Sequence, residues 1–600
     1  MCGILGFNWN DPKLAVTLCS SLKHRGPDQN GTFHDSQVTL GHTRLSILDL
    51  SERGKQPMST PDKNLMIVFN GEIFNYQELR SEFPADTFLS TSDTEVILNA
   101  YKKYGVSCVD KLDGQFAFCI YDVHKKILFL ARDRAGINPL YYYDCEEKFI
   151  FGSELKIILS SGVPKQINTY AFRHYLAYGF TPRSQSIIDH AYKLEPGHYL
   201  IYDLKSKTAV KTKYWDVASS AKITDEAEAI QLIRSHIDRA VKSRLVADVP
   251  VGAFLSGGLD SSAVVAYASK YKQDLNTFSV SFDDPAFDEQ KYSSAVACHF
   301  KTNHHVLSFG ADDVKKLLPQ LAYHYDEPFA DPSMVPTFFV SKVARKHVTV
   351  SLSGDGGDEL FGGYAIYRYY HMLGIQRYYP CFVNKILYAL LKRFSFRFLE
   401  KPRAFFEIGC LAQKHKYARL LSYLARDEFI ALTGTAPDDL YENHATNSEN
   451  YLSQATSIDF HHYLPDDILT KVDRASLANS LESRPPLLDH LLIELAFRIS
   501  PRLKIKGKTT KYIFKKAMEG IVPQEIIYRK KQGFAMPLES YLRKDLRPLV
   551  YKYVFDFDKH ALFDKTFLAS LEQNYSLWNK DYSRLIWTLL MFNLWWEQWM

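Results

Sequence analysis

A cysteine lies directly behind the initiator methionine, in the opening stretch MCGILGF. If Met1 is removed, Cys2 becomes the N-terminal residue and carries both a thiol nucleophile and an α-amine. That amine titrates near ~7.7–8.0, so it can act as the base that activates the thiol. The alternative interpretation is a small residue that begins a buried strand. Cys2 is therefore a candidate nucleophile whose assignment depends on the residues that accompany it.

Four polar clusters interrupt apolar stretches in the first hundred residues. They are RGPD (25–28), GHTRLSILD (41–49), FNGEIFN (69–75) and TSD (91–93). A guanidinium at Arg44 and a carboxylate at Asp93 suit the carboxylate and the ammonium of an amino-acid substrate. The Asn70 side chain and the Gly71 N–H can form an oxyanion hole. With Cys2, these groups supply a nucleophile, a base, a substrate clamp and oxyanion donors.

The heptapeptide SGGLDSS (256–262) has the composition of a phosphate-binding loop. It stands between the apolar stretch PVGAFL and a predicted helix that begins near Asp260. Its two glycines let the backbone approach an anion, while N–H groups at the helix start and the serine hydroxyls can bind phosphate oxygens. It is not a Walker A loop, and GKTT (507–510) fails that pattern because Arg502 stands where Gly is required.

A second glycine-rich loop, SGDGGDELFGGY (353–364), also follows an apolar strand directly. It places Asp355, Asp358 and Glu359 among glycines, an arrangement that suits Mg²⁺ beside phosphate groups. The alternative is an acidic surface turn. Loops at the carboxyl ends of parallel strands gather at one crevice, so we expect this loop to face SGGLDSS.

A basic segment near the C-terminus, RKKQGFAMP (529–537), offers Lys530 and Lys531. Either ammonium could neutralise a pentacoordinate phosphoryl centre. Two lysines before a glycine turn are, by themselves, more typical of a solvated surface. A catalytic role for this segment is supported only by the presence of the two loops described above.

Two different patterns of elements carry these segments. The first ~200 residues favour short strands, at 65–74, 114–123, 126–134 and around 199–204, with helices after Asn75 and at 92–105. Asn75 and Glu78 are spaced as a capping box. After Trp215, strands alternate with helices, which predicts a doubly wound parallel sheet. From Tyr364 onward the chain is mostly helical and aromatic.

Composition bounds the class of protein. A chain of 600 residues is too long for one core, so two or more domains are expected. The net charge of +5 is weak for this length and does not favour nucleic-acid binding. The eight cysteines form no CxxC pair, which fits reduced thiols in the cytoplasm. Asp11 and Lys13 interrupt any signal peptide, and no uncharged stretch reaches the ~18 residues of a membrane span.

The motifs together resemble a known family. MCGI, HRGPD, RLSI, NGEIFN and TSD resemble an N-terminal-nucleophile, class II glutamine amidotransferase domain. SGGLDSS, SGDGGDELFGGY and YRKKQGF resemble the ATP-pyrophosphatase domain of the glutamine-hydrolysing asparagine synthetases. The resemblance implies an αββα sandwich over residues 2–210. It also implies an α/β synthetase domain over residues 225–600, with a helical C-terminal part.

The resemblance also implies a reaction. Cys2 would attack the side-chain amide of glutamine, and the ammonia would travel through an internal passage to the second site. ATP and a carboxylate, aspartate in the family, would there form an acyl-adenylate and pyrophosphate. Ammonia would then give the amide and AMP. A homodimer is the assembly suggested by the family.

Particular residues carry these implied roles. For glutamine they are Cys2, Arg44, Asn70, Gly71, Glu72 and Asp93. For ATP and pyrophosphate they are Leu255, Ser256, Gly257, Gly258, Leu259, Asp260, Ser261, Ser262, Val280, Ser353 and Gly354. Asp260 and Asp358 would hold Mg²⁺, and Asp355 and Lys531 would be catalytic.

Three features leave the acceptor open. Asp355 stands where some members have Glu, so its reach toward Tyr364 is shorter by one methylene. The segment 325–333 matches one branch of the family. Residues 364–420 hold eleven Lys and Arg against two acids, which suits exposed helix faces, a larger acidic acceptor or an anionic membrane surface. The alternatives to asparagine synthesis are another carboxylate acceptor, such as a sugar acid, and a degenerate homologue without activity.

Overall fold

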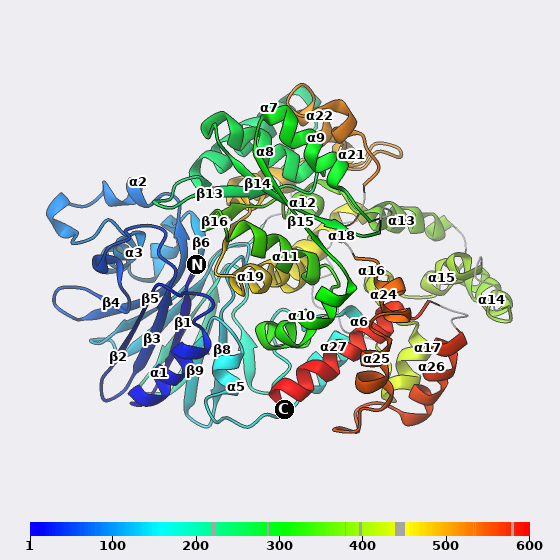
Figure 1. Ribbon diagram of the computed structural model, residues 1–600, viewed down its shortest axis with the longest axis horizontal. Coiled ribbons are helices and arrows are strands. Elements are labelled where there is room, and N and C mark those ends of the chain that lie inside the picture. The colour runs from blue at the N-terminus through cyan, green and yellow to red at the C-terminus, as the bar shows by residue number, and fades with distance from the viewer. Residues whose placement is uncertain are drawn as a thin grey trace.

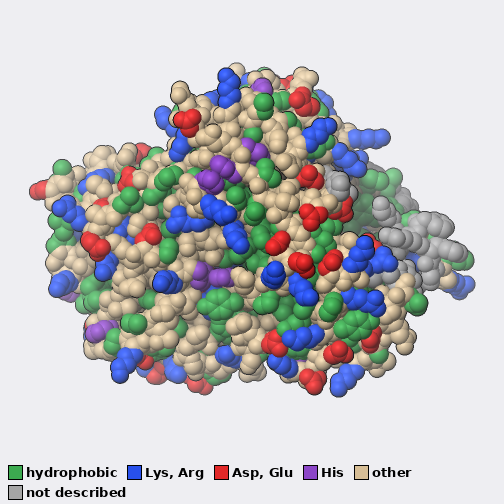
Figure 2. Space-filling model, in the orientation of Figure 1, with side chains coloured by type: hydrophobic (Ala, Val, Ile, Leu, Met, Phe, Trp, Pro, Cys, Tyr) green, Lys and Arg blue, Asp and Glu red, His purple; other side chains and the backbone are tan. Residues whose placement is uncertain are grey.

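The structure is a computed structural model of the 600-residue chain (Figure 1). The residues that it describes are 1–217, 222–284, 287–378, 380–394, 399–437, 450–531, 533, 536–577 and 581–600. Within them, no helix is both long and apolar enough to cross a membrane. Positive and negative side chains are interspersed over the face shown in Figure 2.

Two six-stranded antiparallel sheets occupy the N-terminal end of the described chain. The first has the order β10 (Ala191–Lys193), β8 (Tyr141–Cys145), β9 (Lys148–Gly152), β1 (Gly3–Phe7), β3 (Thr39–Arg44) and β2 (Gln29–His34). The second has the order β12 (Thr208–Lys213), β11 (His198–Asp203), β7 (Ile127–Arg132), β6 (Gly114–Asp122), β5 (Leu65–Ile73) and β4 (Met58–Ser59). The predicted pairing of 114–123 with 126–134 is confirmed as the β6–β7 hairpin.

The two sheets pack face to face between helices. Alternate side chains of both sheets, such as Ile4, Val68 and Phe149, form one apolar core between them. Helix α1 (Pro12–Ser21) packs on the outer side of the first sheet, and α3 (Asp93–Tyr104) packs on the second. This is the predicted αββα sandwich, seen at the N-terminal end of Figure 1.

A five-stranded parallel sheet follows. Its order is β15 (Asn303–Phe309), β14 (Asn276–Phe282), β13 (Val251–Phe254), β16 (Val350–Leu352) and β17 (Glu482–Arg484). Helices α7 (Glu226–Arg244) and α8 (Leu259–Tyr271) share a core with β13. On another core, α10 (Ala311–Tyr325) and α11 (Met334–Ala344) join β14. The predicted doubly wound sheet is therefore confirmed.

The rest of the described chain is mainly helical. Its principal helices are α12 (Gly357–Phe361), α13 (Ala365–Leu373), α14 (Cys381–Lys392), α15 (Glu400–Gly409), α16 (Gln413–Leu421), α17 (Arg426–Thr433), α18 (Tyr451–Ile458), α19 (Thr470–Leu477), α20 (His490–Arg498), α22 (Tyr512–Met518), α24 (Leu538–Arg543), α26 (Lys565–Leu577) and α27 (Ser583–Trp599). The C-terminal helix α27 packs against α10, so the end of the chain closes onto the parallel-sheet unit (Figure 1).

Capping residues and apolar runs in the sequence predict most helices and strands correctly, but not every side-chain contact. Helix α3 begins after Ser92 and ends at Gly105, as predicted. The capping box predicted at Asn75 is wrong, because its side chain makes no cap to α2 (Tyr76–Arg80). The Asn75 amide instead bridges Asp113 N–H and the Lys111 carbonyl. Strands β15 and β17 are not predicted by the sequence, because NHHVLSF contains no long apolar run and ESR has only three residues, all of them polar.

Candidate active sites

Cys2 lies immediately before β1, in the interior between the two units of the chain. Its thiol is 7% exposed and lies 3.8 Å from the Leu45 carbonyl oxygen. Burial raises the pKa of the thiol, and the adjacent N-terminal ammonium opposes that shift. A buried thiol therefore needs a base at close range before it can act as a nucleophile.

The predicted oxyanion donors lie beside Cys2. The Asn70 side-chain oxygen accepts the Cys2 backbone N–H at 2.7 Å. The other end of the same amide, Nδ2, is buried and donates to no acceptor among the described residues. Gly71 has a φ of 152°, and a Cβ there would lie 2.1 Å from the Gln115 carbonyl oxygen. The site thus offers a buried N–H donor that no described residue accepts from, which is what a developing oxyanion requires.

The predicted ammonium-binding acid, Asp93, lies in the same buried cluster as Glu72. Asp93 accepts the Ile73 N–H at 2.9 Å, and burial raises its pKa to about 6. Glu72 pairs with Arg484 at 3.0 Å. Burial nevertheless raises the Glu72 pKa well above its usual range, and the charges of Asp93 and Glu482 add to that shift.

Two of these partners, Glu482 and Arg484, come from β17, at the edge of the parallel sheet. Arg484 Nε donates to Glu482 at 2.6 Å, and Glu482 accepts the Met1 ammonium at 2.5 Å. The strand also holds the nucleotide-side loop, because the Arg484 carbonyl accepts the Ser353 N–H at 2.9 Å. One strand therefore touches both candidate sites.

Arg44 is placed at the edge of this cluster and is 4% exposed. Its Nη atoms donate to the Gln29 side chain at 2.8 Å and to the carbonyls of Leu48, Asp49 and Ser51. The guanidinium thus fixes the loop after β3. The predicted cluster of Cys2, Arg44, Asn70, Gly71, Glu72 and Asp93 is contributed by four segments of the first unit.

A cavity of about 910 Å³ lies at the carboxyl ends of the parallel strands. Both predicted loops line it, so their expected juxtaposition is found. The predicted residues on its wall are Leu255, Ser256, Gly258, Leu259, Asp260, Ser261, Ser353, Gly354, Asp355, Asp358 and Lys531. Helix α8 begins at Leu259, close to the start predicted near Asp260, so its first N–H groups lie in the second half of SGGLDSS.

Three predicted nucleotide residues do not line this cavity. Gly257 has a φ of 71°, and a Cβ there would meet the Ser293 backbone nitrogen at 2.5 Å. Ser262 is fully buried inside α8. Val280 lies on β14, on the wall of a separate small recess that also includes Ser256. Gly257 thus permits the turn of the loop, whereas Ser262 and Val280 support it from behind.

Asp260 and Asp358 lie on either side of a lysine that sequence reasoning did not select. Lys511 Nζ contacts Asp260 at 2.5 Å and Asp358 at 2.7 Å, and Lys531 Nζ contacts Asp358 at 2.6 Å. The two lysines hold the Asp358 pKa at about 2 despite its burial. Asp260 Oδ1 is buried and accepts no hydrogen bond from the described residues. Two carboxylates with one unused oxygen are a donor set that fits Mg²⁺ bound together with phosphates.

The carboxylate that reaches Tyr364 is Glu359, not Asp355. The Tyr364 hydroxyl donates to Glu359 at 2.5 Å, and burial raises the Glu359 pKa to about 7. Lys531 Nζ lies 4.2 Å from the centre of the Tyr364 ring. Asp355 is also on the cavity wall, and burial raises its pKa. Of RKKQGFAMP, residues 532, 534 and 535 lie outside the described residues.

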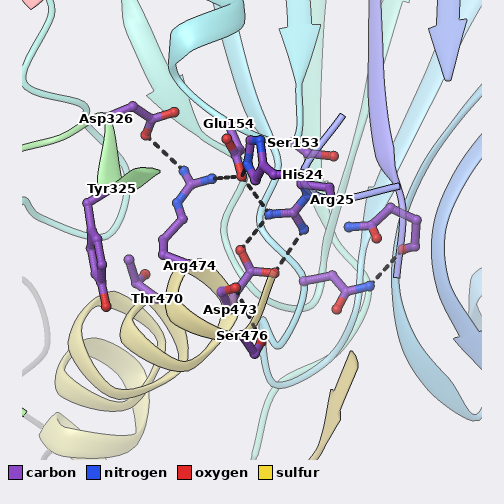
Figure 3. Close-up of polar contacts among 12 residues, drawn as sticks. His24, Arg25, Ser153, Glu154, Tyr325, Asp326, Thr470, Asp473, Arg474 and Ser476 are labelled. Carbon is purple, nitrogen blue, oxygen red and sulfur yellow. Dashed lines mark hydrogen bonds and ion pairs between the residues drawn. The ribbon is translucent and has the colours of Figure 1, made fainter. Parts of the chain in front are cut away.

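A buried ionic network joins the two sites (Figure 3). Arg25, from the HRGPD motif, donates to the Cys2 carbonyl at 3.0 Å and to both Asp473 oxygens at 2.8 and 2.9 Å. Arg25 and Arg474 also share Glu154, at 2.9 and 3.0 Å. Asp473 and Arg474 lie on α19, whose first turn also places Lys471 on the cavity wall. Through Arg25, helix α19 therefore connects the backbone of Cys2 to the cavity.

Comparisons with known proteins agree with this geometry. Residues 1–215 match the model of the glutamine amidotransferase domain, and residues 232–597 match the model described as asparagine synthase. The chain belongs to the asparagine synthase family. It is accordingly an ATP-dependent ligase that hydrolyses glutamine. The expectation of a degenerate homologue without activity is not supported.

Individual relatives cover between 64% and 99% of this family member. A protein named asparagine synthetase [glutamine-hydrolyzing] 1 from Bacillus subtilis is 35% identical over 99% of this chain and 96% of its own. A putative asparagine synthetase from Methanocaldococcus jannaschii is 42% identical, over 64% of this chain and 80% of its own. The protein named amidase chyE from Penicillium rubens is 27% identical, over 88% and 86%.

The residues that sequence reasoning missed share one property. Lys511, Glu482, Arg484 and Asp473 each contact a residue more than 240 positions away. The spacing of Glu482 and Arg484 is the local signal that could have indicated their pairing, because residues two apart on a strand share a face. GKTT was correctly rejected as a Walker A loop, but the lysine that follows it reaches the nucleotide cavity.

Proposed function

We propose that this asparagine synthase family member makes asparagine in the cytoplasm. It would hydrolyse glutamine at Cys2, pass the ammonia through the interior, and amidate aspartate through an acyl-adenylate with release of AMP and pyrophosphate. Residues 2–210 would form the amidotransferase unit and residues 225–600 the synthetase unit. The observation that carries this proposal is the buried network of Arg25, Asp473 and Arg474, which lies between the thiol and the nucleotide cavity.

The first half-reaction follows from the cluster around Cys2. Once Met1 is removed, the Cys2 amine takes the thiol proton, and the thiolate attacks the glutamine amide carbon. The Asn70 Nδ2–H and Gly71 N–H would stabilise the oxyanion, and the amine would return its proton to the departing ammonia. Asp93 would bind the substrate ammonium. Arg44 would bind the substrate carboxylate by giving up one of its bonds to the loop after β3. Water then hydrolyses the thioester to glutamate.

The second half-reaction follows from the cavity. Ser256, Ser261 and the N–H groups at the start of α8 would bind the pyrophosphate end of ATP. Asp260 and Asp358 would hold Mg²⁺, which when bound neutralises phosphate charge. Lys531 would stabilise the negative charge that develops when the acceptor carboxylate attacks the α-phosphate.

The test is a product balance with amide-¹⁵N glutamine, ATP and aspartate. Equal amounts of labelled asparagine, AMP and pyrophosphate support the proposal. Glutamate formation without aspartate-dependent pyrophosphate excludes aspartate as the acceptor. The second candidate, another carboxylate acceptor, is favoured by the size of the cavity, about 910 Å³.

A Cys2→Ala variant separates the two half-reactions. It removes the nucleophile without touching the nucleotide cavity. We therefore expect it to lose glutamine hydrolysis and to keep ammonia-dependent synthesis. The natural enzyme should also lack Met1 when its intact mass is measured. Full retention of Met1 in an active preparation would contradict the use of the Cys2 amine as the base.

A further inference from the structure

Helix α14 presents a row of exposed apolar side chains. Phe382 is 60% exposed, Ile386 53% and Leu390 49%. The spacing of four residues places all three on one face of the helix. We call Phe382, Ile386 and Leu390 the α14 stripe. Large apolar side chains scattered singly on a surface are ordinary, but three in one row on one helix are not.

The other side of α14 is the one attached to the protein. Helix α14 packs against α15, and the Asn384 side chain, 1% exposed, donates to the Gly409 carbonyl at 3.2 Å. The pair α14–α15 projects at the end of the molecule far from the β-sandwich (Figure 1). Hydrophobic and basic side chains are both visible at that end in Figure 2. The stripe therefore faces away from the body of the protein.

The segment of the chain that contains the stripe carries charge of one sign. Residues 362–399 contain no Asp or Glu, whereas the whole chain has 68 in 600. The same stretch contains six Lys and Arg. Of these, Lys385 and Arg393 are exposed on or directly after α14. Lys385 lies between Phe382 and Ile386 along the helix, and Arg393 is three residues beyond Leu390, so both cations lie close to the stripe.

We propose that the α14 stripe docks the enzyme on an anionic membrane surface. An apolar row flanked by Lys and Arg on a short helix is the pattern of a helix that lies in the plane of a bilayer interface. The apolar side chains would enter the boundary between headgroups and acyl chains, while the cations contact lipid phosphates. A second copy of this chain fits less well, because it would bring the same cations together.

The test is flotation of the full-length enzyme with vesicles. One set contains phosphatidylcholine alone, and the other contains 30% phosphatidylglycerol. We expect binding to the anionic vesicles that weakens as salt is raised from 0.05 to 0.5 M. Phe382→Ser with Leu390→Ser should weaken it at least about tenfold. Lys385→Glu with Arg393→Glu should weaken it by at least about 25-fold, since each surface cation accounts for about fivefold.

Matched controls keep the result interpretable. Val210→Ser with Leu577→Ser removes two exposed apolar side chains elsewhere, and Lys205→Glu with Lys346→Glu reverses two exposed charges elsewhere. Both should bind like the natural enzyme. All variants should keep glutamine hydrolysis in vesicle-free buffer, and equal melting temperatures show that folding is intact.

Three results would overturn the proposal. The first is no binding of the natural enzyme to anionic vesicles, or equal binding by the stripe variant. The second is a natural dimer in light scattering that the stripe variant converts to monomer, which assigns the stripe to self-association. The third is stripe-dependent binding to soluble polyglutamate without binding to vesicles, which assigns it to an acidic protein.

Discussion

The pH dependence of glutamine use follows from the burial of Asp93. This carboxylate is proposed to bind the ammonium group of glutamine, and it can do so only when ionised. Burial raises its pKa to about 6, although N–H groups of Ile73 and Thr94 oppose the shift. The ionised fraction therefore falls as the pH drops through 6. From pH 7 to pH 5 it declines about tenfold, whereas an Asp with the ordinary pKa of about 3.9 would lose less than a tenth.

The assay compares two substrates so that shared ionisations cancel. One is glutamine, and the other is 4-carbamoylbutanoate, which has the same amide but no ammonium group. The ratio of their kcat/KM values removes the titration of Cys2, which affects both equally. We expect that ratio to fall about tenfold from pH 7 to pH 5. In Asp93→Asn the ratio should be low at every pH and should no longer vary.

A flat ratio in the natural enzyme would refute this reasoning. It would mean either that Asp93 does not contact the ammonium or that its pKa stays near the ordinary value. Asp93→Asn distinguishes these two cases. A normal glutamine KM in that variant removes Asp93 from the binding site. A raised KM with a flat profile in the natural enzyme means instead that Asp93 binds glutamine with an unshifted pKa.

Two further predictions concern the buried lysine and the network between the sites. Lys511→Met should lower pyrophosphate formation at least about hundredfold, because Asp260 and Asp358 lose the cation between them. Glutamine hydrolysis should stay within twofold of the natural rate. Near-normal synthesis in this variant would show that Lys511 has no role in the nucleotide cavity. Arg25→Met should destabilise the protein by about 3–5 kcal/mol, measured by denaturation, because Asp473 is left buried without its cation. The double variant Arg25→Met/Asp473→Leu should recover most of that loss, and an equally unstable double variant would contradict the ion-pair argument.

The loops that bear chemistry could be predicted because their signals are local. SGGLDSS and SGDGGDELFGGY each follow an apolar strand within a few residues, and parallel strands bring such loops together. Cys2 and Asn70 could be assigned to one site from the chemistry of their side chains and from the family resemblance, because no periodicity in the sequence links residues so far apart. Several strands of the sandwich could be predicted from apolar runs in the sequence, whereas the αββα arrangement was implied by the resemblance alone.

What could not be predicted depends on contacts between distant segments. Lys511 follows a sequence that resembles an incomplete phosphate loop, and only the fold brings it between Asp260 and Asp358. Glu359 rather than Asp355 reaches Tyr364, because the first turn of α12 sets which acid faces the ring. Spacing in the sequence identified the acidic loop but not the direction of each side chain.

The position of β17 means that a mutation in this strand can affect both sites. Its side chains close the pocket around the N-terminus, and its backbone holds the loop of the nucleotide cavity. A strand alternates its side chains, so the insertion or deletion of one residue before Glu482 would turn Glu482 and Arg484 to the opposite face. Such an event would damage both pockets at once. An insertion or deletion near this strand, or the replacement of either unit by that of another protein, would therefore require compensating substitutions in the other unit.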